Sequence, residues 1–447
     1  MTALAERLAC PRCSTPLAGL SCTACQVDFP VHENVPWLVA DPDATRLEWR
    51  NRWQMVMADL DHRQRAARQA LANDPGPATR ARLDNLADGY AAQHRSLKTL
   101  LADLGLTKPA DLETYLALKT RLPSRMGLMA YEANVFRDWC WGERENQASL
   151  DAVRRALGDG TPESVLVLGA GAGRLAYDVH ASCAPGLTVA LELNPLLTTI
   201  TRRMASGETV TLTEFPLAPK AGARSALARS LQAPAPAGKG FEVVLADANR
   251  PPFQAGSFDV VLTPWLLDVI DTPTETMLAL INSLLIPGGR WIYHGSLAFD
   301  RPDISANLNL DELVVLVGDS GFDSLGATEE TTSYLDCPDS RHGRRESVVT
   351  LTARKVADVP APPRQQTLPD WIARGRSPVP LLPSFQSQAM ATRVHAFIMS
   401  LIDGKRSLKD MAAVMEAQRL MPKDEAETAI RGFLIKMLDE ATSGRGL

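Results

Sequence analysis

Residues 164–179 read SVLVLGAGAGRLAYDV, and this stretch decides the fold of the chain. Its opening run of β-branched and aliphatic residues predicts a buried strand. Gly169, Gly171 and Gly173 follow at the spacing G-x-G-x-G, and a helix is expected after them. Glycine permits the backbone angles of a tight turn and lets a ligand approach the backbone, while a helix N-terminus presents free N–H groups. The stretch therefore predicts a strand, loop and helix that bind a nucleotide-like ligand.

Two acidic residues further along the chain favour a ligand that contains a nucleoside. Glu192 ends the next predicted strand, nineteen residues after Gly173, where its carboxylate can accept hydrogen bonds from a ribose diol. Asp247 ends another predicted strand, where it can hold an adenine amino group. Arg174 directly follows the third glycine, so the spacing differs from the dinucleotide pattern G-x-G-x-x-G, and we include Arg174 among the expected binding residues. A generic nucleotide loop with unrelated surface acids is the alternative.

The region from 126 to 356 alternates short aliphatic runs with helical stretches. The predicted strands are SVLVLGAG, LTVALELN, FEVVLAD, FDVVLTPW, GGRWIYHGSL and SVVTLTARK. Such alternation predicts βαβ units and a mostly parallel sheet, which is an α/β fold. Residues 217–240 are biased towards Ala, Pro and Gly and predict a surface insertion. Residues 46–125 have apolar positions at helical spacing and few strand signals, so they predict a helical layer.

The strands after the glycine loop resemble a known class of enzymes. SFDVVLTPWLL, a helix and then LLIPGGRWIY are similar to the fourth strand, helix and fifth strand of class I S-adenosylmethionine (SAM) dependent methyltransferases. The glycine loop, Glu192 and Asp247 fit the cofactor site of that class. The expected fold is therefore a Rossmann-like class I sheet with an N-terminal zinc ribbon, a helical layer and a small, mostly helical C-terminal domain.

Three segments resemble the carnosine N-methyltransferase (N2227-like) family in particular. They are YEANVFRDWCWG, the glycine loop, and FDVVLTPWLLDVIDTP through LLIPGGRWIYHGSL, and they span residues 126–356. YEANVFRDW is the most specific part, because this family places that helix as a lid over the cofactor. The resemblance implies that Asn134 and Arg137 contact SAM, Arg137 at the methionine carboxylate, which the fork of an arginine matches. Pairing of Arg137 with a neighbouring acid is the alternative.

On the acceptor side the chain departs from this family. Asp268 matches an aspartate that faces the dipeptide in carnosine enzymes, and Tyr334 matches a later tyrosine. The Tyr-His pair of the family reads Phe299-Asp300 in this chain, and a second tyrosine is replaced by Arg345. The residues implied for the methyl donor are kept and those for the acceptor are changed, so the expected acceptor is not carnosine itself.

Four residues are candidates for binding the acceptor and taking up its proton. Methyl transfer from a sulfonium is an in-line displacement, in which the protein positions the two reactants and a carboxylate or histidine can accept a proton from a nitrogen. We expect Asp268 first, then Asp300 and Tyr334, with His294 close to the same rim. Asp268 could instead be a helix N-cap, Asp300 a solvated loop acid and His294 a packed residue at a strand end.

Four of the seven cysteines lie in segment 1–45, as Cys10-x2-Cys13 and Cys22-x2-Cys25. Each pair predicts a knuckle whose two sulfurs face one ion, and two knuckles complete a tetrahedral zinc site. Four protein ligands leave no open position, so we expect structural zinc that supplies most of the folding energy of this short segment. A redox role for one pair is the alternative, but it leaves the other pair unexplained. With FPVHENVPWLV after it, the segment resembles the Trm112-like zinc ribbons, which often serve RNA or protein modification.

The C-terminal part begins with a Pro-rich linker, residues 357–380, and continues with helical periodicity over 381–442. Ser407 is a candidate N-cap after a turn at Gly404. This segment loosely resembles PqqD-like or winged-helix modules, which bind peptides or partner proteins. A plain helical cap or a dimerisation element is the alternative.

Composition bounds the partners and the compartment. A net charge of −5 and a pI near 5.9 provide no overall basic field for nucleic acid or an anionic membrane. The start of the chain lacks the apolar run of a signal peptide, and no window approaches the roughly 18 apolar residues that span a bilayer. An odd number of cysteines with one tight cluster suits a reducing compartment, so we expect a cytoplasmic protein.

Three hypotheses about function follow from these patterns. The first is an N-methyltransferase that acts on a small imidazole or amine compound, or on a peptide. The second keeps the enzyme class but takes RNA or protein as substrate, with the zinc ribbon docking it. The third is a regulatory protein that binds SAM without catalysis.

Overall fold

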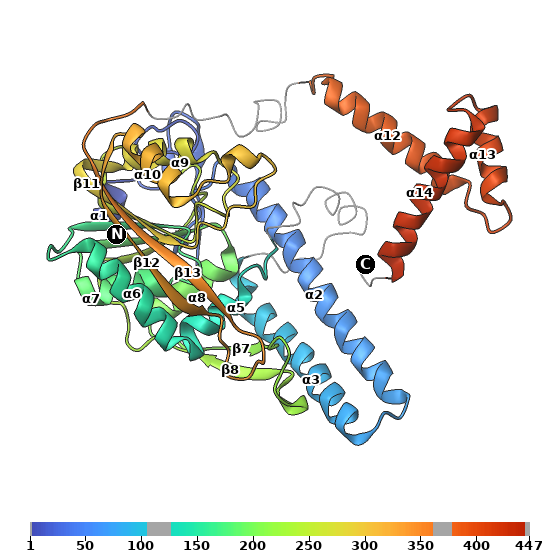
Figure 1. Cartoon of the computed structure of the whole chain (residues 1–447), viewed down its shortest axis with the longest axis horizontal. Coiled ribbons are helices and arrows are strands. Elements are labelled where there is room, and N and C mark those ends of the chain that lie inside the picture. Colours follow the sequence, from blue (N-terminus) through green and yellow to red (C-terminus); the bar gives the residue numbers. More distant parts are fainter. Residues whose placement is uncertain (1, 105–126, 361–377, 443–447) are drawn as a thin grey trace. The chain divides into compact units, whose positions relative to one another are not determined.

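The computed structural model describes residues 2–104, 127–360 and 378–442. The chain divides into two compact units, Met1–Thr367 and Leu368–Leu447, and Figure 1 shows the elements of both. The predicted linker 357–380 lies largely outside the described residues, as does the end of the predicted helical layer, residues 105–126.

A seven-stranded sheet forms the centre of the first unit. Its strand order is β12-β13-β11-β10-β5-β6-β9. Neighbouring strands from β9 to β11 pair in parallel, and β13 is antiparallel to both β11 and β12. The mostly parallel α/β sheet predicted from the sequence is confirmed. The strands are β5 (Ser164–Leu168), β6 (Leu187–Glu192), β9 (Phe241–Leu245), β10 (Phe258–Pro264), β11 (Leu285–Gly295), β12 (Phe322–Tyr334) and β13 (Arg344–Lys355).

Both faces of the sheet are buried, as the continuous apolar strands predicted. Along β5, Val165 and Val167 belong to one hydrophobic core and Leu166 and Leu168 to the other, because strand side chains alternate between faces. The first core includes side chains of α6 (Glu143–Leu157), α7 (Arg174–Cys183) and α8 (Pro195–Ala205). The second includes those of α9 (Thr274–Leu284) and α10 (Leu310–Asp319).

The predicted helical layer consists of a helix pair that joins the first core. The two helices are α2 (Pro42–Ala72) and α3 (Pro77–Leu100), followed by the short η1 (Ala102–Leu104), and Figure 1 shows α2 and α3 side by side. Trp49 and Trp53 of α2 are buried in this core together with Leu97 of α3. The side chain of Asp41 caps α2 by accepting a hydrogen bond from the Ala44 N–H at 3.0 Å.

The cysteine-rich segment packs against the sheet and shares its second core. It contains α1 (Thr2–Ala5) and the short strands β1 (Ser21–Cys22), β2 (Val27–Asp28), β3 (Val31–His32) and β4 (Val35–Pro36). Just after β4, the Leu38 N–H donates to the Leu245 carbonyl of edge strand β9 at 2.8 Å. Leu8 and Leu38 are buried in the second core. The N-terminal segment is therefore continuous with the core of the first unit.

Two features differ from what the sequence patterns suggested. The predicted insertion, residues 217–240, contains β8 (Leu227–Leu231), which pairs with β7 (Val210–Glu214) in a hairpin and buries Leu231. Strand β12 was not predicted, because most of its side chains are exposed at the edge of the sheet and its sequence lacks apolar alternation.

The second unit is helical over its described residues. It contains α12 (Pro383–Ser400), α13 (Leu408–Ala417) and α14 (Lys423–Thr442), with a small core around Ile398, Met415 and Ile430. The Ser407 side chain caps α13 by accepting from the Asp410 N–H at 3.2 Å, as predicted. Residues 378–442 contain no strand, so the hairpin of a winged-helix module is absent from this part.

None of the described helices is both long and apolar enough to cross a membrane.

Candidate cofactor and acceptor site

The glycine loop joins β5 to α7 at the carboxyl end of the sheet, as predicted. Gly169, Gly171 and Gly173 have positive φ angles of 70°, 58° and 84°, which favour glycine. A Cβ added to Gly171 would meet no atom within 4 Å, because this residue borders a cavity. A Cβ added to Gly173 would lie 2.2 Å from Cγ2 of Thr201 on α8. Gly171 thus leaves room for a ligand, and Gly173 allows a helix to pack against the loop.

Glu192 and Asp247 lie on the same cavity as the loop. Glu192 accepts hydrogen bonds from the N–H groups of Gly171 at 2.9 Å, Leu193 at 2.9 Å and Asn194 at 3.0 Å. Burial raises the pKa of Glu192, and the three N–H donors oppose that shift. Asp247 accepts from the Asn249 N–H at 2.9 Å. The two carboxylates follow β6 and β9, the positions expected for ribose and adenine recognition.

The segment YEANVFRDW borders the cavity as a short helix, α5 (Glu132–Phe136), followed by a π-helical turn, η2 (Arg137–Trp141). Asn134 and Arg137 both line the cavity. Arg137 also forms an ion pair with Asp138 at 2.7 Å. Burial disfavours the charge of Arg137, but the Asp138 carboxylate raises its pKa above the ordinary value. Arg137 is therefore a cation at the cavity wall and pairs with a neighbouring acid as well.

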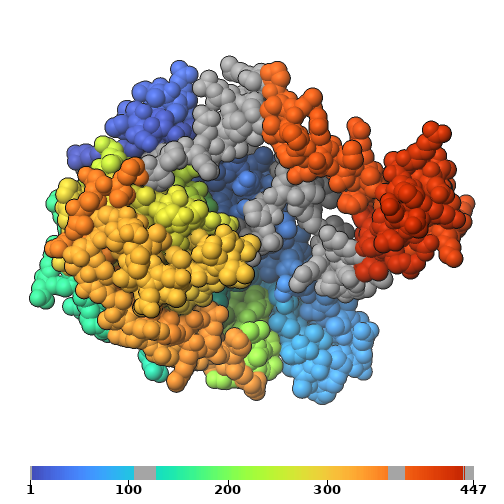
Figure 2. Space-filling view, turned by 45° about the horizontal axis from the view of Figure 1, so that its top comes forward, coloured from blue at the N-terminus to red at the C-terminus, as the bar shows by residue number. Residues whose placement is uncertain are grey.

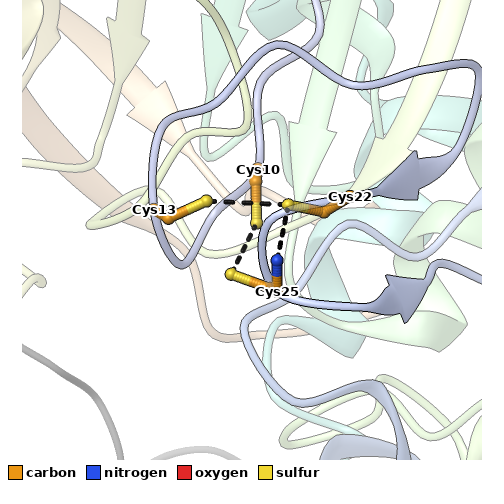
Figure 3. A group of neighbouring side chains, drawn as sticks. All are labelled: Cys10, Cys13, Cys22 and Cys25. Atoms are coloured by element: carbon orange, nitrogen blue, oxygen red, sulfur yellow. Dashed lines mark hydrogen bonds between the residues drawn. The ribbon is translucent and has the colours of Figure 1, made fainter.

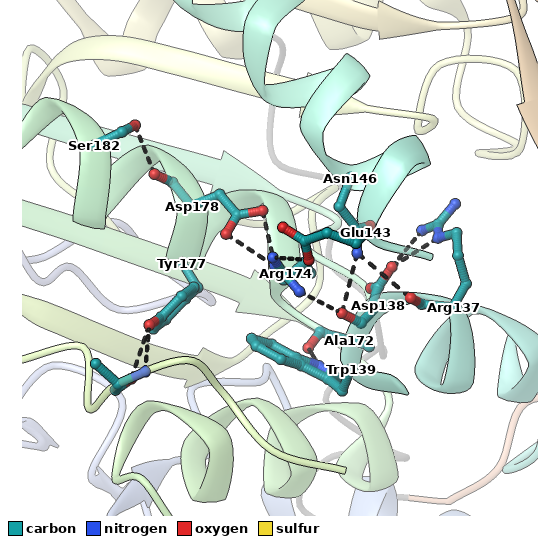
Figure 4. A network of polar contacts seen from close by, with 11 residues as sticks. Arg137, Asp138, Trp139, Glu143, Asn146, Ala172, Arg174, Tyr177, Asp178 and Ser182 are labelled. Atoms are coloured by element: carbon teal, nitrogen blue, oxygen red, sulfur yellow. Dashed lines mark hydrogen bonds and ion pairs between the residues drawn. The ribbon is translucent and has the colours of Figure 1, made fainter. Parts of the chain in front are cut away.

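Arg174 has a different position from the one predicted. It is not among the residues that line the cavity. Its guanidinium donates to the Asp138 carbonyl at 2.8 Å, to Glu143 at 2.9 Å and to both carboxylate oxygens of Asp178 at 2.9 Å, as Figure 4 shows. Nearby, the Trp139 indole donates to the carbonyl of Ala172 in the glycine loop at 2.8 Å. Arg174 thus joins α7 to η2. It lines a smaller neighbouring hollow together with Arg137 and Asp138.

The cavity itself has a volume of about 470 Å³. Its wall is built from η2 and α5, the glycine loop, and the residues that follow β6, β9, β10 and β11. Ligand cavities of roughly 300–1,000 Å³ are typical for small molecules and cofactors. The open cradle at Gly171 and the two strand-end carboxylates fit the nucleoside and methionine parts of SAM.

Asp268 lies in the cavity wall after β10, in a turn and not at a helix start. Its Oδ2 accepts hydrogen bonds from Ser296 Oγ at 3.3 Å and the Ala298 N–H at 3.0 Å. Its Oδ1 is buried and has no hydrogen-bond partner among the residues that the structure describes. The N-cap alternative does not apply, because α9 begins six residues later with Pro273 at its N-cap. One carboxylate oxygen is therefore fixed in place and the other is unsatisfied.

Aromatic side chains surround this part of the cavity. Tyr334, the last residue of β12, receives a hydrogen bond on its hydroxyl from Asn134 Nδ2 at 3.2 Å. Its ring centroid lies 4.8 Å from that of Trp265. The guanidinium of Arg344 lies 4.5 Å from the centroid of Tyr334 and pairs with Glu346 at 2.6 Å. Tyr334 thus links α5, the end of β10 and the start of β13.

His294 and Asp300 do not line the cavity. His294 is buried in β11, where its Nδ1 hydrogen-bonds Thr350 Oγ1 at 3.0 Å, and burial lowers its pKa to about 4. Its ring lies beside that of Trp265, with centroids 6.3 Å apart. Asp300 is an exposed loop residue. The positions match the two alternatives given above. His294 is a packed residue near the end of a strand, and Asp300 is a solvated acid in a loop.

Several cavity residues were not singled out from the sequence. They are Tyr131, Asp138, Trp265, Arg344 and Glu346. Tyr131 and Asp138 belong to the YEANVFRDW block. Their place in that block was the one feature of the sequence that pointed to the cavity. Trp265 has a φ of 50°, which sequence patterns do not reveal. Arg345, which replaces a family tyrosine, is exposed, and its neighbour Arg344 lines the cavity instead.

The four N-terminal cysteines converge on one point. All four sulfurs lie within 4.8 Å of one another, and Figure 3 shows them facing a common centre. The sulfurs of Cys10 and Cys25 are 4.0 Å apart, and those of Cys13 and Cys22 are 3.6 Å apart. A tetrahedral zinc site with Zn–S bonds of about 2.3 Å requires sulfur separations of about 3.8 Å. The cluster therefore fits a single zinc ion held by four thiolates.

Comparisons with known proteins agree with this architecture. Residues 166–293 match the family model described as a methyltransferase domain. No curated protein matches the chain. The match covers the glycine loop, Glu192, Asp247 and Asp268.

Solved structures with similar folds share little sequence with the chain. A Haloferax volcanii candidate methyltransferase, in complex with the Trm112 methyltransferase activator, is 14% identical, with 53% of this chain and 100% of that chain covered and a TM-score of 0.35. A candidate histamine N-methyltransferase from Thermotoga maritima is 15% identical, with 50% and 98% covered and a TM-score of 0.29. A SAM-dependent methyltransferase from Methanosarcina mazei is 16% identical, with 44% and 94% covered and a TM-score of 0.31. These likenesses carry no conclusion about the acceptor.

The matched domain and the class I sheet together define the protein as a SAM-dependent methyltransferase.

Proposed function

We propose that the protein transfers the methyl group of SAM to a nitrogen of a small imidazole or amine compound, or of a peptide. The observation that carries this proposal is the unsatisfied Oδ1 of Asp268 in the cavity wall. A buried acceptor atom without a partner costs free energy, so a bound N–H group at this position would be favoured. When bound, SAM supplies an electrophilic methyl group on its sulfonium.

Asp268 can orient the acceptor and remove its proton. Its Oδ2 is held by Ser296 and the Ala298 N–H, so the carboxylate has a fixed orientation. With SAM bound, Oδ1 would accept the proton that the acceptor nitrogen releases when it takes the methyl group and the sulfonium leaves as a neutral thioether. Trp265 and Tyr334 border the same region with aromatic side chains, which suit a planar imidazole.

We assign the remaining site residues in line with this reaction. Glu192 and Asp247 would hold the ribose and adenine, and Asn134 and Arg137 the methionine end of SAM. Tyr334 would contact the acceptor. We also propose a structural zinc ion on Cys10, Cys13, Cys22 and Cys25.

RNA is less well supported than a small molecule or peptide. Between residues 2 and 45 the only basic side chains are Arg7 and Arg12. Arg7 donates to the carbonyls of Ser257 and Ala3, and Arg12 donates to that of Ala40. A phosphate backbone needs clustered free cations, and the N-terminal segment offers none in its described residues.

Replacement of Asp268 by Asn tests this proposal. We expect turnover to fall by about 10²–10⁴-fold, the range for loss of a general base, while S-adenosylhomocysteine (SAH) affinity changes less than threefold. Acceptors to screen are imidazole dipeptides, amines, peptides and RNA, with SAH release as the readout. Asp300→Asn is the matched control, because this exposed acid does not line the cavity, and its turnover should equal that of the wild type. Equal turnover in Asp268→Asn and wild type would refute the assignment, and SAM binding without turnover on any acceptor would favour a regulatory role.

A further inference from the structure

A second hollow lies next to the cavity, and the proposed methyl transfer does not use it. Its volume is about 1020 Å³, and it is lined by the start of α9, residues 301–308 and α10. The residues of this region, yellow to light orange in Figure 2, lie together on the facing surface. We call this hollow the α9–α10 groove.

The groove is acidic. Six carboxylates and a single arginine line it, and none of the six has an ion pair among the described residues. Asp303 and Glu312 cap helices with their carboxylates. The carboxylates of the other four accept no hydrogen bond in the described part of the chain. The six acids are Asp271, Glu275, Asp303, Asp311, Glu312 and Asp319.

The groove also has apolar surface and an unsatisfied hydroxyl. Leu308, Leu316 and Val315 line it, and Val315 is 65% exposed. Thr274 lines it as well. This residue is only 2% exposed, and its hydroxyl has no hydrogen-bond partner within the described ranges of the chain. A buried hydroxyl without a partner costs free energy that a bound polar group would recover. The groove thus offers negative charge, apolar contact and a free hydrogen-bonding group.

The groove is continuous with the wall of the methyl-transfer cavity. Asp268 and Ile270 line the cavity, and the next residue, Asp271, lines the groove. Arg301 connects the two by donating from Nη2 to the carbonyls of Leu267 at 3.0 Å and Ile270 at 3.2 Å. A chain lying in the groove would therefore reach the cavity next to Asp268.

We propose that the α9–α10 groove docks a basic segment of a peptide or protein acceptor, and so selects the acceptor at a distance from the reacting nitrogen. Lysine or arginine side chains of the segment would pair with the free carboxylates, and apolar side chains would cover Val315 and Leu316. Nucleic acid is excluded from this groove, because its phosphates would face the same carboxylates. This inference rests on the proposed N-methyl transfer and restricts its acceptor to a peptide.

The test uses the full-length, zinc-loaded protein and a fluorescein-labelled peptide, Lys-Ala-Leu-Arg repeated three times with blocked ends. A peptide with Glu in place of Lys and Arg is the charge-reversed probe. Fluorescence anisotropy at low salt should show micromolar binding of the basic peptide only. Binding should weaken at least tenfold at 0.5 M salt, where charges are strongly screened.

The variant Asp271→Asn/Asp311→Asn/Asp319→Asn should bind the basic peptide at least tenfold more weakly than the wild type. The control variant Asp159→Asn/Glu416→Gln/Glu425→Gln also removes three exposed carboxylates, but none of them lines the groove. Asp159 lies in a loop, Glu416 near the end of α13 and Glu425 near the start of α14. This variant should bind the basic peptide like the wild type. SAH binding, measured by calorimetry in all three proteins, should be unchanged.

The outcomes separate the two proposals. Loss of peptide binding in both variants, no binding by the wild type, or displacement of the peptide by SAH would overturn the groove assignment. Failure of the wild type to bind SAH would overturn the proposed function instead, whatever the peptide does.

Discussion

Replacing Gly173 with Ala should destabilise the first unit by about 2–4 kcal/mol. The added Cβ would lie 2.2 Å from Thr201 Cγ2 and 2.6 Å from Thr201 Oγ1. Thr201 cannot easily rotate away, because its hydroxyl donates to the Leu197 carbonyl at 2.8 Å. Overpacking of this kind costs about 1–3 kcal/mol, and a left-handed φ of 84° adds roughly 1 kcal/mol for Ala.

Gly171→Ala is the matched control for this prediction. Gly171 also has a positive φ, 58°, but an added Cβ would meet no atom within 4 Å, so its cost in stability should be about 1 kcal/mol. That Cβ would enter the cavity, so this variant should lose SAH affinity instead.

Urea unfolding followed by tryptophan fluorescence measures the difference, since seven of the eight tryptophans precede residue 368. Thr201→Ala should recover part of the loss when added to Gly173→Ala, which a double-mutant cycle quantifies. Equal losses in the two single variants, or no recovery by Thr201→Ala, would refute the packing of α8 on the loop.

Two further predictions concern pH and metal. Burial, with Glu214 nearby, raises the pKa of Glu132 to about 8, so the folded state keeps a proton that the unfolded chain releases near pH 4.5. Stability from this group is therefore lost as pH rises from 4.5 through 8. Allowing for partial exposure, we expect the contribution of Glu132 to the unfolding free energy to fall by about 2 kcal/mol between pH 6 and 8.5. The difference between wild type and Glu132→Gln should change by this amount over that range, and parallel pH profiles of the two proteins would contradict this. Removal of one zinc per chain by a chelator should lower the Tm of the first unit by more than about 5 °C, because Leu8 and Leu38 of the ribbon belong to its core. Zinc release without a change in Tm, followed with a colorimetric zinc indicator and circular dichroism, would show that the cluster is not structural.

The sequence predicted the parts of the fold whose local signals match their final environment. Strand β5 and the glycine loop combine a fully buried strand with glycines that require positive φ, and both signals are visible in the residues. Strand β12 has no such signal, because an exposed edge strand needs no apolar alternation. The hairpin β7–β8 was hidden for a related reason, since four of the five β8 residues are not buried.

The site was predicted best where a residue follows a strand. Glu192 ends β6, while Asp247 and Asp268 lie in the short segments that follow β9 and β10, so the parallel sheet brings them to one edge. Arg174 and His294 satisfy the same rule by position, yet their side chains are taken up by Asp178 and Thr350. Side-chain partners of this kind depend on contacts far apart in the sequence, which spacing does not reveal.

The cavity beside Gly171 should bind SAM. Calorimetry of SAM and SAH with the wild type, Glu192→Ala and the control Glu208→Ala tests it most directly, since Glu208 is an exposed acid that does not line the cavity. We predict micromolar binding by the wild type and Glu208→Ala, and at least tenfold weaker binding by Glu192→Ala, which corresponds to a loss of about 1.4 kcal/mol. No binding by the folded wild type, or equal affinity in Glu192→Ala, would contradict the account.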